Sequence, residues 1–399
     1  MLRSLFSGIS GLRSHQTMLD VTGNNIANVN TTGFKSSQIQ FQDTLSQLVS
    51  NAGGAQPGAG VGGTNPAQVG LGVRVAGITT SFSQGASQLT GRSTDMMIQG
   101  DGFFAVRKGA DTYYTRAGSF DFDSTGQMVL PGEGALVQGW AATNGVIDTN
   151  GPLTDLRVPA GTLMAAIATK SATYEGNLEQ SAPDGTTITR AIGVYDSTGN
   201  ETQLNLTFQA STTAAGVTTW NLTGNDGAAS TAYGPLAFDS TGKLTSAGTL
   251  TVGGITVDIS KITGFAGLDT VAATKQDGQA AGTLQSFSLG SDGTITGAFS
   301  NGLKQVIGRI ALASFTNPAG LEKAGGSLFQ TTVNSGNPQL GAAGTGGRGT
   351  LAGGALEMSN VDLSSEFTNL IVAQRGFQAN SRVITTSDEV LQELVNLKR

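Results

Sequence analysis

The strongest constraint on the fold is the last stretch of the chain, residues 364–399, which contains no proline and one glycine, Gly376. Apolar residues recur there in steps of three or four, the spacing of one face of an α-helix. Ser364 is placed to cap the start of this helix, and Lys398 and Arg399 lie where a helix dipole favours cations. At roughly 1.5 Å per residue the helix is about 50 Å long, so its apolar face needs a long partner.

A matching pattern lies at the other end of the chain. Within residues 1–27, apolar side chains alternate in steps of three and four, as in a coiled-coil heptad. We therefore predict two terminal helices that pair through their apolar stripes. Gln374, Ser381 and Asp388 interrupt the C-terminal stripe. Two interpretations stay open: a helical hairpin within one chain, or a stripe that packs among many copies. The predicted seam residues are Leu5, Ile9, Leu12, Leu19, Ile26, Phe367, Leu370, Ile371, Phe377, Ile384, Leu391 and Leu394.

The rest of the chain has the composition of a turn-rich β protein. Charged residues make up 13% of the sequence, against about 25% in typical domains. From residue 73 the hydrophobic period changes from helical to alternating, which predicts short strands. The expected fold class is mainly β with long terminal α-helices and nested β domains. The expected boundaries are 1–67 and 355–399 for a terminal helical domain, 68–145 and 285–354 for an inner β domain, and 146–284 for an inserted outer β domain.

Two further local patterns carry predictions. Residues 51–72 consist largely of Gly, Ala, Pro and Asn, which predicts a flexible arm or linker. An aromatic residue followed by Asp-Ser-Thr-Gly occurs three times, with the aspartates at Asp123, Asp196 and Asp239. An aspartate that opens a turn accepts hydrogen bonds from the following backbone, and glycine supplies a positive φ, so each repeat predicts a hairpin tip. Calcium is the functional alternative, but the spacing and distal Glu of an EF-hand are missing.

Several classes of chemistry have little support in the sequence. The chain has one histidine, His15, and no cysteine, so Ser-His-Asp catalysis, thiolate metal sites and disulfides are not expected. A glycosidase built from two carboxylates stays open, although nothing favours it. A net charge of −6 without a basic stripe argues against nucleic acid. We expect no enzyme activity, no cofactor and no membrane span. The first residues lack the pattern of a cleaved signal peptide, so the protein either stays inside the cell or leaves by a route that reads an uncleaved N-terminus.

Four long motifs together carry a family resemblance. They are GNNIANVNTTGFKSS at 23–37, GDGFFAVRKGADTYYTRAGSFDFDSTG at 100–126, FSNGLKQVIGRIALASFTNPAGL at 299–321, and ALEMSNVDLSSEFTNLIVAQRGFQANSRVITTSDEVLQELVNL at 355–397. The chain resembles the bacterial flagellar hook proteins, within the axial rod-and-hook family. The resemblance is weakest over 146–284. The residues that carry the N-terminal motif are Asn24, Asn25, Asn28, Gly33, Phe34 and Lys35.

The resemblance implies a structural subunit that assembles with many copies of itself into a flexible tubular helical polymer. Such a tube joins rod to filament and transmits torque, with the terminal helices lining its channel. The implied partners are a distal rod protein, a hook cap protein, a hook–filament junction protein and the flagellar type III export apparatus, and the implied location is the extracellular hook. The alternatives are a distal rod subunit of the same family, or, in a different class, a secreted β-rich adhesin or glycan-acting protein.

Overall fold

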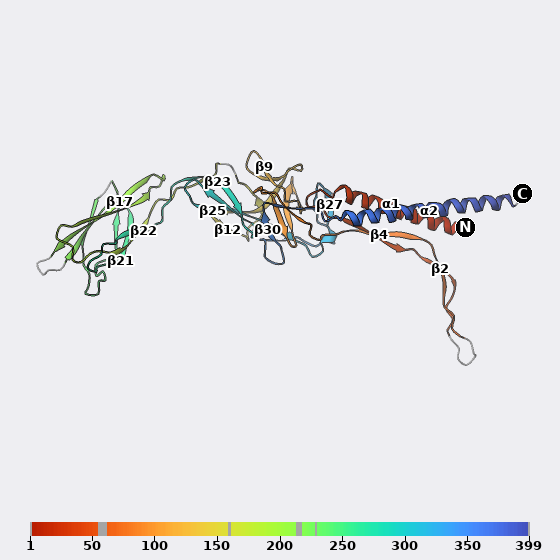
Figure 1. Ribbon diagram of the computed structural model, residues 1–399, viewed down its shortest axis with the longest axis horizontal. Helices are drawn as coiled ribbons and strands as arrows, with labels where there is room; N and C mark the ends of the chain where they lie inside the picture. Colours follow the sequence, from red (N-terminus) through yellow and green to blue (C-terminus); the bar gives the residue numbers. More distant parts are fainter. Residues whose placement is uncertain (1, 55–61, 159–160, 213–217, 228–229, 398–399) are drawn as a thin grey trace. The chain divides into compact units, whose positions relative to one another are not determined.

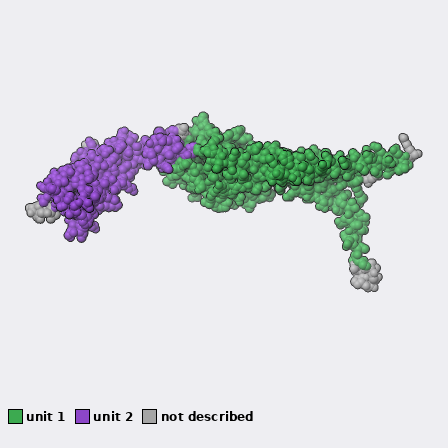
Figure 2. Space-filling model, viewed as in Figure 1, with its two compact units in different colours: residues 1–159, 288–296, 306–399 green, residues 160–287, 297–305 purple. Residues whose placement is uncertain are grey.

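The computed structural model shows a mainly β chain with one long helix at each end, which confirms the predicted fold class (Figure 1). It describes residues 2–54, 62–158, 161–212, 218–227 and 230–397. The chain divides into two compact units (Figure 2). Unit 1 comprises residues 1–159, 288–296 and 306–399, and unit 2 comprises residues 160–287 and 297–305. The domain boundaries expected from the sequence stay a prediction.

The two helices of unit 1, α1 (Leu2–Ala27) and α2 (Leu363–Asn396), run antiparallel and side by side (Figure 1). The prediction that Ser364 caps α2 is wrong. Asp362 is the cap, and its Oδ1 accepts a hydrogen bond from the backbone N of Ser364 at 2.9 Å. A carboxylate at this place also complements the positive end of the helix dipole. Lys398 and Arg399 lie outside the described residues.

Two antiparallel ribbons follow α1. β1 (Ser37–Asp43) pairs with β4 (Val73–Thr80), and β2 (Ser46–Ser50) pairs with β3 (Ala67–Gly70). Part of the segment expected as a flexible arm or linker is therefore a strand, because β3 lies inside it. Glycine and proline masked the short extended segment that pairs with β2. Residues 55–61 of the predicted arm lie outside the described residues.

The remainder of unit 1 is built around a twisted sheet in the order β25, β11, β7, β8, β28, β27. Its phenylalanine side chains form an apolar cluster with Tyr114 and Leu321. Residues 304–310 form β25 and residues 312–314 form β26. The bounds are β5 (Ser87–Leu89), β6 (Met96–Gln99), β7 (Phe103–Lys108), β8 (Asp111–Thr115), β9 (Asp121–Phe122), β10 (Met128–Leu130), β11 (Ala135–Thr143), β12 (Val146–Ile147), β13 (Thr154–Asp155), β25 (Lys304–Ile310), β26 (Leu312–Ser314), η2 (Pro318–Gly320), β27 (Glu322–Gly325), β28 (Leu328–Gln330), β29 (Gln339–Gly341), β30 (Thr350–Gly353) and β31 (Ala355–Glu357).

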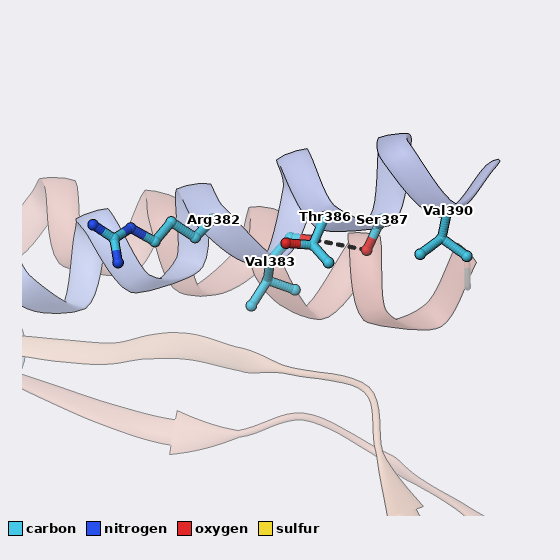
Figure 3. A pocket seen from close by; sticks show the side chains of 5 residues that line it. All are labelled: Arg382, Val383, Thr386, Ser387 and Val390. Atoms are coloured by element: carbon cyan, nitrogen blue, oxygen red, sulfur yellow. Dashed lines mark hydrogen bonds between the residues drawn. The ribbon is translucent and has the colours of Figure 1, made fainter. Parts of the chain in front are cut away.

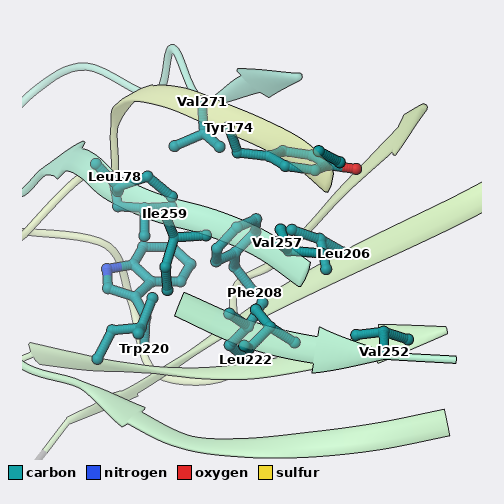
Figure 4. Packing of buried hydrophobic residues seen from close by; sticks show 14 of the residues in the cluster. Tyr174, Leu178, Leu206, Phe208, Trp220, Leu222, Val252, Val257, Ile259 and Val271 are labelled. Carbon is teal, nitrogen blue, oxygen red and sulfur yellow. The ribbon is translucent and has the colours of Figure 1, made fainter. Parts of the chain in front are cut away.

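Unit 2 contains two four-stranded sheets, β20-β21-β15-β22 and β16-β17-β18-β19. Large apolar side chains fill the space between them (Figure 4). Phe208 and Trp220 are fully buried there, as the alternating pattern of β17 and β18 requires. The bounds are β14 (Leu163–Met164), β15 (Ser171–Asn177), β16 (Thr187–Tyr195), β17 (Glu201–Thr212), β18 (Thr218–Asn225), β19 (Ser230–Leu236), β20 (Thr249–Val252), β21 (Ile255–Thr263) and β22 (Ala272–Gln276). Residues of β23 (Gly282–Leu289) and of β24 (Thr294–Phe299) are divided between the two units.

The Asp-Ser-Thr-Gly repeats form turns with the predicted hydrogen bonds. At the turn between β16 and β17, Oδ1 of Asp196 accepts from the Thr198 N at 2.8 Å, from the Thr198 Oγ1 at 2.7 Å and from the Asn200 N at 2.9 Å. Gly199 has a φ of 87°. The same arrangement recurs at Asp123 and Asp239. Among the described residues no group of three His, Asp or Glu side chains is arranged to hold a metal ion. None of the described helices is long and apolar enough to cross a membrane.

Candidate functional site

The two terminal helices contact each other through small residues. A Cβ added to Gly11 would lie 2.6 Å from the Oδ1 of Asn380, and one added to Gly376 would overlap the His15 ring. These glycines therefore allow the two backbones to approach more closely than larger residues would. The contact runs along the pair, from Gly8 beside Ile384 to Asn25 beside Glu366.

Within one chain, the most buried residues of α1 lie beside its predicted seam rather than in it, and the seam itself stays a prediction. None of the predicted seam residues of α1 is buried. With 3.6 residues per turn, its stripe lies roughly 100° around the helix from the face that meets α2. The face of α1 that carries small residues packs against α2, because closely spaced helix backbones make more van der Waals contacts. The buried residues of the helix pair are Gly8, Gly11, Ser14, Thr22, Asn25, Glu366 and Ala373.

The predicted seam residues of α2 fall into two groups. Phe367, Ile371 and Leu394 are 51%, 56% and 53% exposed. The others are partly covered beside α1. All the predicted apolar positions of α1 are also only partly covered. The partly covered residues are Leu5, Ile9, Leu12, Leu19, Ile26, Leu370, Phe377, Ile384 and Leu391.

A second apolar stripe of α2 was missed in the sequence. Val372, Val383, Val390 and Leu397 follow one another in steps of eleven, seven and seven, and each is at least 42% exposed. Such steps keep residues on one side of a helix. A shallow hollow of about 350 Å³ lies along this side, as Figure 3 shows. The spacing of these four residues is visible in the sequence, but the predicted seam of the same helix has a more regular spacing and was chosen instead. The lining residues are Arg382, Val383, Thr386, Ser387 and Val390.

The N-terminal motif joins the helix pair to the strands of unit 1. The Asn25 amide donates to Glu366 Oε1 of α2 at 3.0 Å and to the Ser37 carbonyl at 2.8 Å, and its own oxygen accepts from the Ser37 N at 3.0 Å. Asn28 bonds back to Asn24. Asn25 therefore ties together α1, α2 and the start of β1.

Lys35 of the same motif belongs to a buried ion network. Its Nζ lies 2.6 Å from Glu357 Oε1 of β31, and both side chains are 0% exposed. Arg116 Nη1 lies 3.4 Å from the other carboxylate oxygen. Burial lowers the pKa of Lys35, although Glu357 acts in the opposite direction. Breaking such a pair leaves an uncompensated buried charge, so the network holds the motif rigidly in place. The sequence indicated Lys35 but not its two partners, because they lie far away in the chain.

Gly33 and Phe34 complete the junction. Gly33 has a φ of 69°, and a Cβ there would lie 2.6 Å from the carbonyl carbon of Arg116. A larger residue would therefore push the motif away from the sheet. The Lys323 Nζ lies 5.0 Å from the centre of the Phe34 ring, within reach of a cation–π contact. The motif thus acts as a structural joint between helices and sheet.

Four family profiles match the chain. They are described as "Flagella basal body rod protein" (5–35), "Flagellar hook protein FlgE/F/G D1 domain" (97–171), "Flagellar basal body protein FlaE D2 domain" (163–305) and "Flagellar basal body rod FlgEFG protein C-terminal" (352–397). Together they follow the order of the motifs along the sequence.

Individual relatives match over the full length. The flagellar hook protein FlgE of Borreliella burgdorferi is 41% identical, with 100% of each chain covered. The flagellar basal-body rod protein FlgG of Bacillus subtilis is 35% identical, again with 100% of each covered. The crystal structure of Helicobacter pylori flagellar hook protein FlgE2 matches with a TM-score of 0.51 at 17% identity, covering 68% of this chain and 100% of that one. That likeness shows a shared fold.

Proposed function

This chain belongs to the flagellar hook protein family, and from that premise we infer that it is a structural subunit of the bacterial flagellar hook that polymerises with itself. The family is a structural one, and its full-length relatives include hook proteins at 41% identity. We propose further that the polymer is a flexible tube that joins rod to filament and transmits torque.

One observation carries the proposal of an assembly surface: α2 keeps apolar residues exposed on both flanks after it has paired with α1. Phe367 and Ile371 lie on one flank, and Val383 and Val390 lie on the other. Burying a side chain of this size contributes about 1.5–3 kcal/mol. A helix with two exposed apolar flanks gains this energy when like helices pack on both sides. We therefore propose that the predicted seam residues, together with Val383 and Val390, form contacts between copies.

The partners of such a tube follow from its place in the flagellum. We propose contacts with a distal rod protein at one end and with a hook–filament junction protein at the other. A hook cap protein would guide growth, and the flagellar type III apparatus would export the chain to its extracellular position. The helical regions 1–67 and 355–399 are proposed to form the wall of the channel. The inserted region 146–284 is proposed as the outer domain.

A rod subunit is the second candidate, because the Bacillus subtilis rod protein matches the full chain at 35% identity. A rod is a stiff straight tube, whereas a hook is curved. Electron microscopy of material sheared from cells, with an antibody against this chain, separates the two. Short curved tubes that carry the label support the hook. Labelled straight tubes would transfer the chain to the rod, and label that never lies on tubes would reject both.

A further inference from the structure

A cavity in unit 1 has no role in the function described so far. Its volume is about 410 Å³, and it lies beside the buried ion network. Every residue that lines it belongs to unit 1. The residues that matter for the argument are Phe82, Asp101, Phe103, Arg116, Phe315 and Pro318.

Arg116 is an incompletely paired cation at this cavity. Its side chain is 2% exposed, and its contact with Glu357 is long, at 3.4 Å. The other oxygen of this carboxylate, Oε1, accepts from the Lys35 Nζ at 2.6 Å and from the Gly85 N at 2.9 Å. The Nε of Arg116 has no hydrogen-bond partner among the described residues. A buried N–H without an acceptor is costly, so this guanidinium is suited to an incoming oxygen atom.

Asp101 supplies the opposite charge on the same cavity. It is exposed and lies between Gly100 and Gly102, whose φ values are 103° and 131°. Its carboxylate makes no side-chain hydrogen bond within the described residues and acts on Arg116 electrostatically. Because these two lining charges cancel, the cavity does not favour a free anion. It suits a neutral group that offers one acceptor and one donor, as a peptide unit does.

The apolar part of the cavity lies next to this charge pair. The Phe103 ring is 5.3 Å from the Phe82 ring and 5.6 Å from the Phe315 ring, centre to centre. Pro318 completes this surface. Aromatic surfaces of this kind hold an apolar side chain.

We propose that this cavity binds a peptide segment of a second copy of this chain. An apolar side chain of the neighbour rests on the phenylalanine rings, its backbone carbonyl accepts from Arg116, and its backbone N–H donates to Asp101. The proposal rests on the polymer described above, which brings identical copies together. Charge also favours this occupant, because the chain has exposed apolar residues within uncharged stretches. Val333 is 105% exposed, and residues 324–347 around it contain no charged side chain.

The first test uses a photocrosslinking amino acid, benzoylphenylalanine, at Thr316, an exposed residue on the cavity. Irradiated tubes should give dimers of this chain, and mass spectrometry should locate the second end in an uncharged apolar segment. Irradiated monomer should give none. Tubes without dimers, or with crosslinks only to a different protein, would overturn the inference while leaving the hook assignment intact. Failure of the parent chain to form tubes would instead overturn the hook assignment.

The second test changes the cavity at two exposed residues, one by filling it and one by removing the Asp101 charge. Thr316→Trp and Asp101→Asn should each lower the ratio of polymer to monomer about tenfold, the effect of losing one modest contact. The melting temperature of the Thr316→Trp monomer should stay at the parent value, which separates assembly from folding. Thr112→Trp and Asp111→Asn, at exposed positions of β8 outside the cavity, are the matched controls. Parental assembly by both cavity variants would overturn the inference.

Discussion

Unit 2 and the terminal helices differ in how much of their apolar surface is buried within the chain. Unit 2 has a closed core in which Phe208 and Trp220 are 0% exposed. In α2 the buried residues are Glu366 and Ala373, while Phe367 stays 51% exposed. The core of unit 2 therefore buries its largest side chains within one chain, whereas the apolar residues that the helices leave exposed are proposed to contact other copies. Stability of the monomer and ability to assemble should respond to different substitutions.

The largest effect on the monomer is expected from Trp220→Ala in unit 2. Removing a fully buried large side chain leaves a cavity, and such changes cost about 3–5 kcal/mol of unfolding free energy. Urea unfolding followed by near-ultraviolet circular dichroism measures the loss, and Trp220→Phe should lose less. Tubes should still form below the new melting temperature. A Trp220→Ala chain that unfolds like the parent would show that the core is not the source of stability.

The opposite response is expected from Phe367→Ala in α2. Monomer unfolding should change by no more than about 0.5 kcal/mol, as for surface positions. Assembly should lose about 1.5–3 kcal/mol per subunit if this side chain becomes buried between copies. Sedimentation of polymer against free monomer measures it. Gln374→Ala, an exposed polar residue on the same helix, is the control and should assemble nearly as the parent does. Equal assembly of both variants would remove this flank from the proposed contact surface.

Gly376→Ala tests the contact between the two helices. Its Cβ would overlap His15, so the pair must separate or shift, at a cost of about 1–3 kcal/mol. Gly23→Ala is the matched control, because no atom lies within 4 Å of the added Cβ. It should stabilise α1 by roughly 0.5–1 kcal/mol. Hydrogen exchange of the helix amides measures both. Slower exchange in the Gly376→Ala helices would contradict the close packing.

The sequence predicted the positions of helices and strands better than it predicted which side of each helix packs against its neighbour. Apolar periodicity located both helices and the alternating strands of unit 2, because burial within one layer imposes a strict period. It did not identify the face of α1 that contacts α2, because Gly8 and Gly11 on that face carry no hydrophobic signal. Glu366 and Glu357 were missed for another reason. Each charge is stabilised by a partner more than 300 residues away, and local patterns contain no information about such pairs.

The smallest expected effect is the pH dependence of the stability of unit 2. Hydrogen bonds from the Thr198 side chain and the Asn200 backbone lower the pKa of Asp196 from 3.8 to about 2. Because the folded pKa lies below the unfolded one, the ionised carboxylate stabilises the fold fully only at pH values well above the unfolded pKa of 3.8. This contribution is lost as the pH falls towards 2. The pKa values of Asp123 and Asp239 are lowered in the same direction.

The Asp196 carboxylate should therefore make the stability of unit 2, rather than that of the helices, slightly sensitive to acid. Asp196→Asn keeps an acceptor oxygen but removes the charge, so the melting temperature of unit 2 should fall less between pH 4 and pH 2 than in the parent. Thr198→Val removes the side-chain donor and should raise the pKa of Asp196, which an NMR titration of its carboxyl carbon measures directly. An unchanged pKa in Thr198→Val would mean that the backbone donors alone hold the charge. Parent and Asp196→Asn melting curves that shift equally with acid would show that the turn contributes nothing to the stability of unit 2.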